Sequence, residues 1–361
     1  MEFLTDLNLT TALSFAGKAV SSKPTHPVLS GVLIESRDGK LCLSGFDLSV
    51  GAKVTIAADV VTPGSMVVPY KLLMDLVSRI NAPIHFTQEG DRVLVLKTNT
   101  GVYRINCFDP SEFPVLFEVN PEHKLTIGGE ALARCFDVGY AASHDESKQV
   151  LQGINLTDSG SGAKFAATDG HRLVVKEYRQ DGEIGIESIN IPSSLSPFLR
   201  HVNPSDEVTI AYSDGMALLK WGNYELTTRL LDGTYPDYER LFPASFARSA
   251  RFDKKTALQS LNRVMVMDEA RVILNIEAGK IVFSVDSEES GAKESIDATV
   301  EGDPIEIPTE MCLNPKYLTD ALKHQEGETI VFNSNSPTSP IVITSEGFTQ
   351  RTLMMPIQIR K

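Results

Sequence analysis

Three prolines divide this 361-residue chain into equal steps. Pro69, Pro192 and Pro315 are each 123 residues apart, and each is followed by leucine three and seven positions later. Proline is favoured in the first turn of a helix, where its missing N–H costs nothing, and residues at +3 and +7 lie on one helix face. The spacing therefore predicts that an amphipathic helix of one kind, with a buried leucine stripe, begins at equivalent points of three repeated units. The leucines are Leu72, Leu76, Leu195, Leu199, Leu318 and Leu322.

Other features repeat in the same phase. An apolar stripe with i, i+3, i+7 spacing predicts a helix at the start of each unit. In the third unit, alternating apolar residues at 272–276 and 281–285 flank a glycine turn, which predicts a β-hairpin. Chance spacing among 19 prolines is the weaker explanation of so much agreement. The stripes are Leu13, Ala16 and Val20; Leu132, Cys135 and Gly139; and Leu258, Leu261 and Met265; the units close at Phe113 and Pro114, Tyr235 and Pro236, and Met355 and Pro356.

The order helix, strands, helix, strands predicts an α+β fold in which two helices pack on a β-sheet in every unit. The chain is too long for one ordinary core and fits three domains of about 120 residues. We expect the domains to span 1–121, 122–244 and 245–361.

Composition predicts a cytoplasmic protein with no membrane partner. Apolar residues make up 42% of the chain, yet no apolar run approaches the ~18 residues of a membrane span. The first residues are acidic where a secretory signal would be basic. The scattered cysteines Cys42, Cys107, Cys135 and Cys312 suggest neither a zinc site nor a disulfide framework. We expect no metal and no cofactor.

Positive charge is concentrated on the predicted helices. The six helix segments carry a net charge of +6, although the chain as a whole carries −13. One interpretation is a helical wall that faces a polyanion such as DNA, which attracts cations without sequence readout. The other is that these lysines and arginines are ordinary solvated helix faces, and charge alone favours that second interpretation.

The string ATDGHRL at residues 167–173 is the sharpest local motif. One hypothesis makes Asp169 and His171 the acid–base pair of a hydrolase, with Arg172 as an anion clamp. No nucleophile motif or metal motif accompanies them. Asp-Gly is a turn signal, so we prefer a tight turn.

Together with the threefold plan, ATDGHRL, the string YPDYERLFP at 235–243 and a tail with Met-Pro near its end resemble the bacterial DNA polymerase sliding clamp family, the β subunit of the replicative polymerase. The resemblance covers the whole chain. It implies a head-to-tail homodimer whose six domains form a ring, with helices lining a central hole. It also implies a processivity factor that encircles double-stranded DNA without reading its sequence. Implied protein partners are the replicative polymerase, the clamp loader, and other polymerases and repair proteins that insert short apolar motifs into a groove.

The family's functional residues map onto three sets of positions in this sequence. The resemblance implies a partner-peptide groove formed by Leu151, Thr168, Gly170, His171, Arg172, Leu173, Pro236, Arg240, Leu241, Pro340, Leu353, Met355, Pro356 and Ile357. In such a ring the cations of the predicted helices would face the DNA, and the resemblance adds a DNA-facing loop at His144 and Lys148 and a family position at Lys23; the helix cations are Lys18, Lys71, Arg79, Arg134, Arg200, Lys254, Lys255, Arg263, Lys316 and Lys323. It implies a dimer interface at Tyr103, Ile105, Met265 and Val266.

These inferences predict a non-enzymatic ring. The alternatives are a hydrolase that uses Asp169 and His171 and carries accessory repeat domains, and a purely structural repeat protein that does not contact DNA. A further expectation is that the last residues, Ile359, Arg360 and Lys361, extend past the groove.

Overall fold

A computed structural model of the chain describes residues 1–5, 8–180, 185–286, 291–302 and 309–358. The chain forms two compact units, one of residues 1–133 and 194–231 and the other of residues 134–193 and 232–361. No helix in the described ranges is long and apolar enough to cross a membrane.

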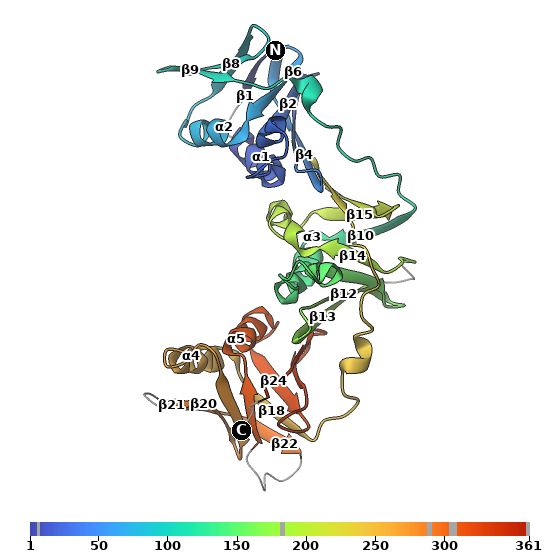
Figure 1. Cartoon of the computed structure of the whole chain (residues 1–361), viewed down its shortest axis with the longest axis vertical. Helices are drawn as coiled ribbons and strands as arrows, with labels where there is room; N and C mark the ends of the chain where they lie inside the picture. Colours follow the sequence, from blue (N-terminus) through green and yellow to red (C-terminus); the bar gives the residue numbers. More distant parts are fainter. Residues whose placement is uncertain (6–7, 181–184, 287–290, 303–308, 359–361) are drawn as a thin grey trace. The chain divides into compact units, whose positions relative to one another are not determined.

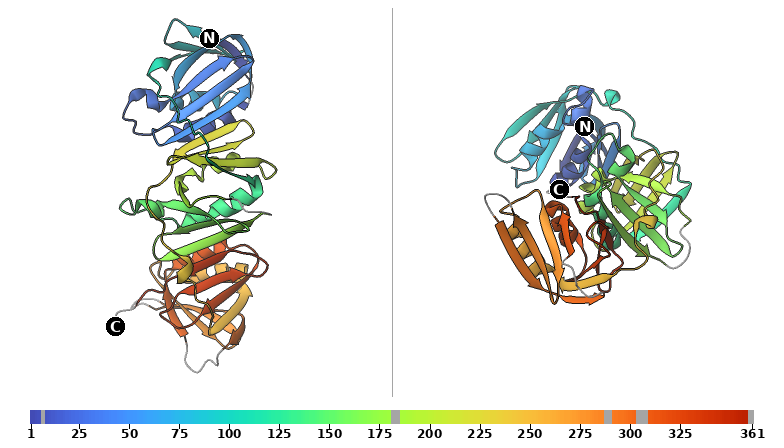
Figure 2. Two further views of the ribbon diagram at one scale, coloured as in Figure 1. Left: turned by 90° about the vertical axis from the view of Figure 1, so that its right-hand side faces the viewer. Right: turned by 60° about the horizontal axis from the view of Figure 1, so that its bottom comes forward.

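The first unit contains two antiparallel sheets (Figure 1). One has five strands in the order β5-β1-β7-β8-β9, and the other has eight in the order β10-β15-β16-β17-β4-β3-β2-β6. In the eight-stranded sheet, early and late segments of the chain join where β4 pairs with β17 (Figure 2, left). The strands are β1 (Glu2–Thr5), β2 (Gly31–Arg37), β3 (Lys40–Phe46), β4 (Val50–Ala57), β5 (Asp59–Thr62), β6 (Gly64–Pro69), β7 (Ile84–Glu89), β8 (Val93–Lys97), β9 (Val102–Asn106), β10 (His123–Gly128), β15 (Glu207–Ser213), β16 (Met216–Trp221) and β17 (Tyr224–Arg229).

Helices cover one side of these strands, and α1 packs against α2. Phe15 on α1 is fully buried and makes edge contacts with Phe198 and Trp221. The helical segments are α1 (Asn8–Ala16), η1 (Gly17–Ala19), η2 (Pro27–Ser30), α2 (Tyr70–Val77), η3 (Pro110–Glu112) and η7 (Phe198–His201); α3 (Gly129–Phe136) and η6 (Ser193–Leu195) lie where the chain passes from one unit to the other.

The second unit also contains two sheets. Nine strands follow the order β14-β11-β12-β13-β26-β25-β24-β18-β22, and four follow β21-β20-β19-β23. The strands are β11 (Gly153–Asp158), β12 (Gly162–Thr168), β13 (Arg172–Arg179), β14 (Ile189–Pro192), β18 (Arg248–Asp253), β19 (Val272–Glu277), β20 (Lys280–Asp286), β21 (Gly291–Asp297), β22 (Thr299–Gly302), β23 (Thr309–Leu313), β24 (Thr329–Ser334), β25 (Ile341–Ser345) and β26 (Arg351–Met354). The helical segments are η4 (Asp137–Ala141), η5 (Gln149–Gln152), η8 (Glu239–Leu241), α4 (Lys254–Val264) and α5 (Pro315–His324).

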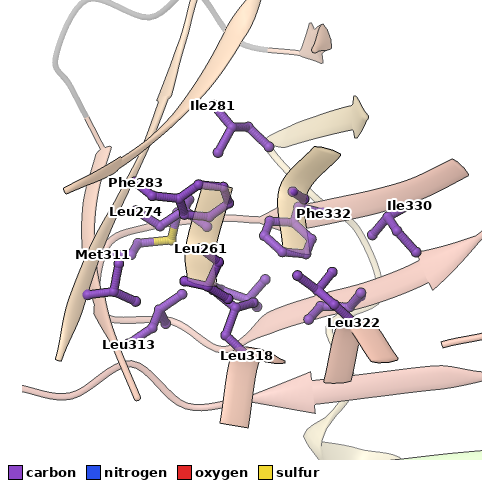
Figure 3. Close-up of a cluster of buried hydrophobic side chains, with 14 of the residues drawn as sticks. Leu261, Leu274, Ile281, Phe283, Met311, Leu313, Leu318, Leu322, Ile330 and Phe332 are labelled. Carbon is purple, nitrogen blue, oxygen red and sulfur yellow. The ribbon is translucent and has the colours of Figure 1, made fainter. Parts of the chain in front are cut away.

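The hairpin predicted in the third sequence repeat is confirmed as β19 and β20, and it contributes many residues to a buried apolar cluster. Alternate residues of β19 and β20 are buried and meet α4 and α5, which pack on each other. Figure 3 shows Leu261 from α4 and Leu318 and Leu322 from α5 pointing into this cluster. Burial of one such leucine contributes about 1.5–3 kcal/mol.

The phased prolines do not all begin a helix in the same way. Pro315 is the first residue of α5, after the Asn314 cap, and the leucines at +3 and +7 are buried. Pro69 instead caps α2, which begins one residue later. The predicted leucine stripe is therefore wrong in the first sequence repeat. Leu72 is 53% exposed there, and the buried residues are Leu73 and Val77, at +4 and +8 from Pro69.

In the described residues of the second sequence repeat, no α-helix follows the phased proline. Pro192 ends β14, and two 3-10 turns, η6 and η7, follow it. Pro197 lies between them, where its ring and missing N–H prevent an α-helix from continuing. The leucine stripe is still satisfied, because Leu195 and Leu199 are both buried.

Candidate functional site

The ATDGHRL string forms the tight turn between β12 and β13. The Oδ1 atom of Asp169 accepts hydrogen bonds from the backbone N–H of His171 (2.8 Å) and Arg172 (3.0 Å). Gly170 has φ of +94°, a conformation that glycine adopts without strain. The Thr168 hydroxyl closes the turn by donating to the Arg172 carbonyl (2.6 Å). The preferred turn interpretation is confirmed, and the carboxylate of Asp169 is occupied in holding it.

Arg172 is buried and connects this turn to α5. Its Nε donates to Asp169 (3.2 Å), and its Nη1 donates to Asp320 Oδ2 on α5 (2.9 Å). Nη2 donates to the carbonyl of Tyr140 (2.7 Å), and the guanidinium lies 4.3 Å from the ring centre of Tyr317. With only 7% of its side chain exposed, Arg172 is a structural connection that positions the turn.

The chain tail runs beside the turn. β26 pairs with β13, where Met354 faces Arg172, and the N–H of Met355 donates to the His171 carbonyl (2.9 Å). The tail then leaves the sheet, with Met355 and Ile357 each 41% exposed. The turn and the tail thus lie side by side, and Met355 and Ile357 of the tail give this edge its exposed apolar surface.

A buried floor lies under this edge. Leu173 and Leu353 face each other across β13 and β26 and belong to one apolar cluster with Tyr235 and Tyr238. The hydroxyl of Tyr235 accepts the N–H of Thr168 (3.0 Å), and burial raises the pKa of Tyr235, so the phenol stays neutral.

The segment that carries the YPDY string is fixed to the sheet by charge. Glu239 forms ion pairs with Lys164 (2.7 Å) and Arg351 (3.2 Å). Arg351 also lies 4.3 Å from the ring centre of Phe242. The 235–243 segment is therefore a fixed wall.

The structure brings most of the predicted groove residues to this place. Leu151 packs on the floor, whereas Leu241, at 54%, is one of the most exposed large apolar residues. Arg240 points to solvent with 86% of its side chain exposed and pairs with Asp237. The remaining predicted positions are Gly170 and His171 in the turn, Pro236 in the wall, Pro340 just before β25 and Pro356 in the tail; Ile359, Arg360 and Lys361 lie outside the described residues.

Sequence reasoning missed Tyr140, Tyr317 and Asp320, which hold Arg172. The phased proline placed residues 317 and 320 on a helix, but no local pattern pointed them at residue 172. The tyrosines of the YPDY string were recognised in the sequence but not chosen as site residues, although they form the floor.

Twelve of the thirteen predicted DNA-facing residues fall into two groups. Four are held in ion pairs: Arg79 with Asp75, Arg134 with Glu326, Lys254 with Glu328 and Arg263 with Glu294. Eight are exposed and form no ion pair within the described residues: Lys23, Lys71, His144, Lys148, Arg200, Lys255, Lys316 and Lys323. The thirteenth, Lys18, lies with its Nζ 2.8 Å from His201 Nε2, and its pKa is lowered by burial and by the charge of Arg200.

The predicted interface residues lie on the strand β9 and in the segment that follows α4. Tyr103 and Ile105 belong to β9, the edge strand of the five-stranded sheet, but Ile105 is only 2% exposed and faces the core. Met265 and Val266 follow α4, and Val266 is 79% exposed. The side chains of Tyr103 and Val266 are therefore accessible to a second chain, whereas Ile105 contributes only its backbone at the edge of β9.

Comparisons with known proteins match this architecture along the chain. Three family models match in order: the DNA polymerase III beta subunit N-terminal domain at residues 1–117, its central domain at 129–237 and its C-terminal domain at 239–358. The chain therefore consists of three clamp-type α+β domains and belongs to the DNA polymerase III beta subunit family, the sliding clamps.

Individual relatives agree with this assignment. The beta sliding clamp of Synechococcus elongatus is 36% identical over 98% of this chain and 97% of its own length, and that of Synechocystis is 32% identical over the same shares. Among solved structures, the sliding clamp of Bacillus subtilis matches all of both chains with a TM-score of 0.92 at 24% identity. The hydrolase hypothesis finds no support in these relatives.

Proposed function

We propose that two copies of this chain close head to tail into a ring around duplex DNA and act as a processivity factor for the replicative polymerase. Family membership over nearly the full length carries this proposal. Sliding clamps are non-enzymatic, and we propose the same for this chain, which would work in the cytoplasm. We propose domain boundaries at 1–121, 122–244 and 245–361.

Enclosure allows the DNA contacts to be weak. The seven lysines and arginines among the eight exposed positions named above supply charge for phosphate contacts, whereas the four ion-paired cations contribute less because a carboxylate already neutralises each of them. Phosphate contacts carry no sequence information and weaken with salt, which suits sliding. A closed ring holds DNA by topology even when each contact is brief.

The apolar edge beside the turn is the proposed partner groove. Met355, Ile357 and Leu241 present exposed apolar side chains, and the leucines and tyrosines of the floor beside them are buried. A short apolar peptide from the polymerase, the clamp loader or another partner would insert there, since methionine-containing surfaces adapt to different sequences. Arg172 acts as a positioning residue that holds the turn beneath the tail.

The dimer seam would join the β9 edge at Tyr103 to the segment at Met265 and Val266. An exposed edge strand has unpaired backbone groups that a second chain can complete.

Two measurements test the proposal together. Sedimentation at micromolar concentration should give the mass of a dimer, and a fluorescence-polarisation titration should show binding of a polymerase C-terminal peptide. The matched variant is Met355→Ala, which should weaken the peptide without altering the dimer mass. A purely monomeric species, or equal peptide affinity in the variant, would contradict the ring or the groove respectively.

A further inference from the structure

The first unit contains a turn built like the groove turn. The Oδ1 atom of Asp47 accepts hydrogen bonds from the N–H of Ser49 (2.8 Å) and Val50 (2.7 Å), at the same spacing as in the turn after Thr168. The strand that follows, β4, pairs with β17, and the N–H of Arg229 donates to the Ser49 carbonyl (3.1 Å). The tail makes the same contact with the groove turn. The repeat has therefore produced a second copy of the groove's framework.

This second copy encloses a cavity of about 580 Å³, within the usual range of ligand sites. Strands β2, β3, β4, β16 and β17 form its floor, and residues 113–120 cover it. On that floor Gly51 faces Thr227, at the positions where the groove has two leucines. A Cβ atom added to Gly51 would come within 2.6 Å of Thr227 Oγ1 and 3.1 Å of Leu116 Cδ2, so Thr227 and Leu116 already pack closely against this glycine and a larger residue would displace them.

The covering segment has a free backbone. Residues 114–121 lie outside any helix or strand, and within the described chain their N–H and C=O groups form no hydrogen bond with other backbone groups. The side chains of this segment are held, since Phe117 packs on Phe46 and lies 4.8 Å from the Arg229 guanidinium, but the backbone polar groups beside them stay open. An extended chain can add to free backbone of this kind by main-chain hydrogen bonds, with pockets for its alternate side chains.

The negative charge around the cavity favours a basic occupant. Glu35, Glu118 and Glu225 line it, against the single cation Lys53. Glu225 pairs with Lys220 (2.7 Å), whereas Glu35 and Glu118 are exposed and form no ion pair with any described residue. A neutral or acidic segment would leave this surplus of negative charge uncompensated, and a basic one would be attracted.

We propose that this cavity is a second peptide site, which takes an extended segment of a partner protein with alternating apolar and basic residues. The likeness to the groove rests on the proposed function, but the cavity, the free backbone and the carboxylates do not. The apolar side chain would enter the cavity beside Leu33 and Leu218, and the basic neighbours would lie near Glu35 and Glu118.

The test uses two labelled peptides and the full-length protein in 150 mM salt. The probe for the cavity is the hexapeptide Lys-Leu-Lys-Phe-Lys-Leu, with Glu-Leu-Glu-Phe-Glu-Leu as its charge-reversed counterpart; the apolar polymerase peptide reports on the groove. Glu35→Lys should weaken the basic probe by about five-fold, the upper range for reversing one exposed charge pair, and leave the groove peptide unchanged. The exposed Glu269→Lys, in the other unit, changes total charge equally and should have no effect.

The outcomes separate this proposal from the groove. If the wild-type protein does not bind the groove peptide but binds the basic probe, and Glu35→Lys weakens that binding, the proposed function is contradicted and the second site is supported. Absence of basic-probe binding, or equal weakening by Glu35→Lys and Glu269→Lys, overturns the second site whatever the groove peptide does. A change in sedimentation mass caused by Glu35→Lys would also overturn it, because the cavity would then hold a second copy of the chain.

Discussion

Replacement of Arg172 by alanine should strongly destabilise the compact unit formed by residues 134–193 and 232–361. The guanidinium lies between the carboxylates of Asp169 and Asp320, which are 13% and 26% exposed, and donates to the Tyr140 carbonyl. Loss of one partner from a buried charge network costs about 3–5 kcal/mol, because the remaining charges stay desolvated and unpaired. For a unit of this size, the midpoint of thermal unfolding should fall by roughly 6–20 °C.

Differential scanning calorimetry of Arg172→Ala, with and without the polymerase peptide, measures this effect. Arg172→Lys keeps the charge but loses the planar fork, so its transition should lie between those of wild type and alanine. Arg179→Ala is the control, since 73% of the Arg179 side chain is exposed and its only ion pair among the described residues is at 4.0 Å. An unchanged transition in Arg172→Ala, with weakened peptide binding, would refute the structural role and make Arg172 a direct peptide contact.

Four further predictions follow from the described contacts. Truncation after Met354 should weaken the groove peptide at least ten-fold in a polarisation titration while the fold survives, whereas removal of Leu353 and Met354 should unfold β26, because both are buried. Burial alone would raise the pKa of Asp137, but hydrogen bonds from His324 and Lys176 lower it. The stability that Asp137 contributes is therefore present above its unfolded pKa of about 4 and is lost as the pH falls through the lower folded pKa. In urea unfolding, the stability difference between Asp137→Asn and wild type should accordingly shrink below pH about 4. Hydrogen bonds from Arg263 and Ser260 lower the pKa of Glu294 to about 2, so the Arg263–Glu294 ion pair persists at neutral pH. Glu294→Gln should free the Arg263 cation and steepen the salt dependence of DNA binding by about one ion. Val266→Asp should convert the dimer to monomers in sedimentation, and retention of the dimer mass would move the seam elsewhere.

Features set by short-range chemistry were predictable from the sequence. The turn at Asp169 and Gly170 depends on a carboxylate and a glycine three residues or fewer from their partners. The hairpin at 272–286 follows from alternation, and α5 follows from a proline with leucines in phase. The error at Leu72 is one residue of register, because Pro69 serves as a cap where Pro315 is the first helical residue.

Features set by long-range contacts were not predictable. Asp320 meets Arg172 across 148 positions of sequence, and neither residue carries a local signal for the other. Glu294 on β21 likewise neutralises Arg263 on α4, so a count of cations on helices overstates the charge available for DNA. Ile105 belongs to a strand edge, as expected, but the strand's alternation turns its side chain into the core.

Retention on circular DNA tests the central claim most directly. The protein is loaded onto nicked circular plasmid with a clamp loader, separated from free protein by gel filtration, and the plasmid is then cut once with a restriction enzyme. A ring held by topology should stay with the intact circle in high salt and leave within minutes after linearisation. Equal retention on circular and linear DNA, or release by salt from the intact circle, would contradict enclosure.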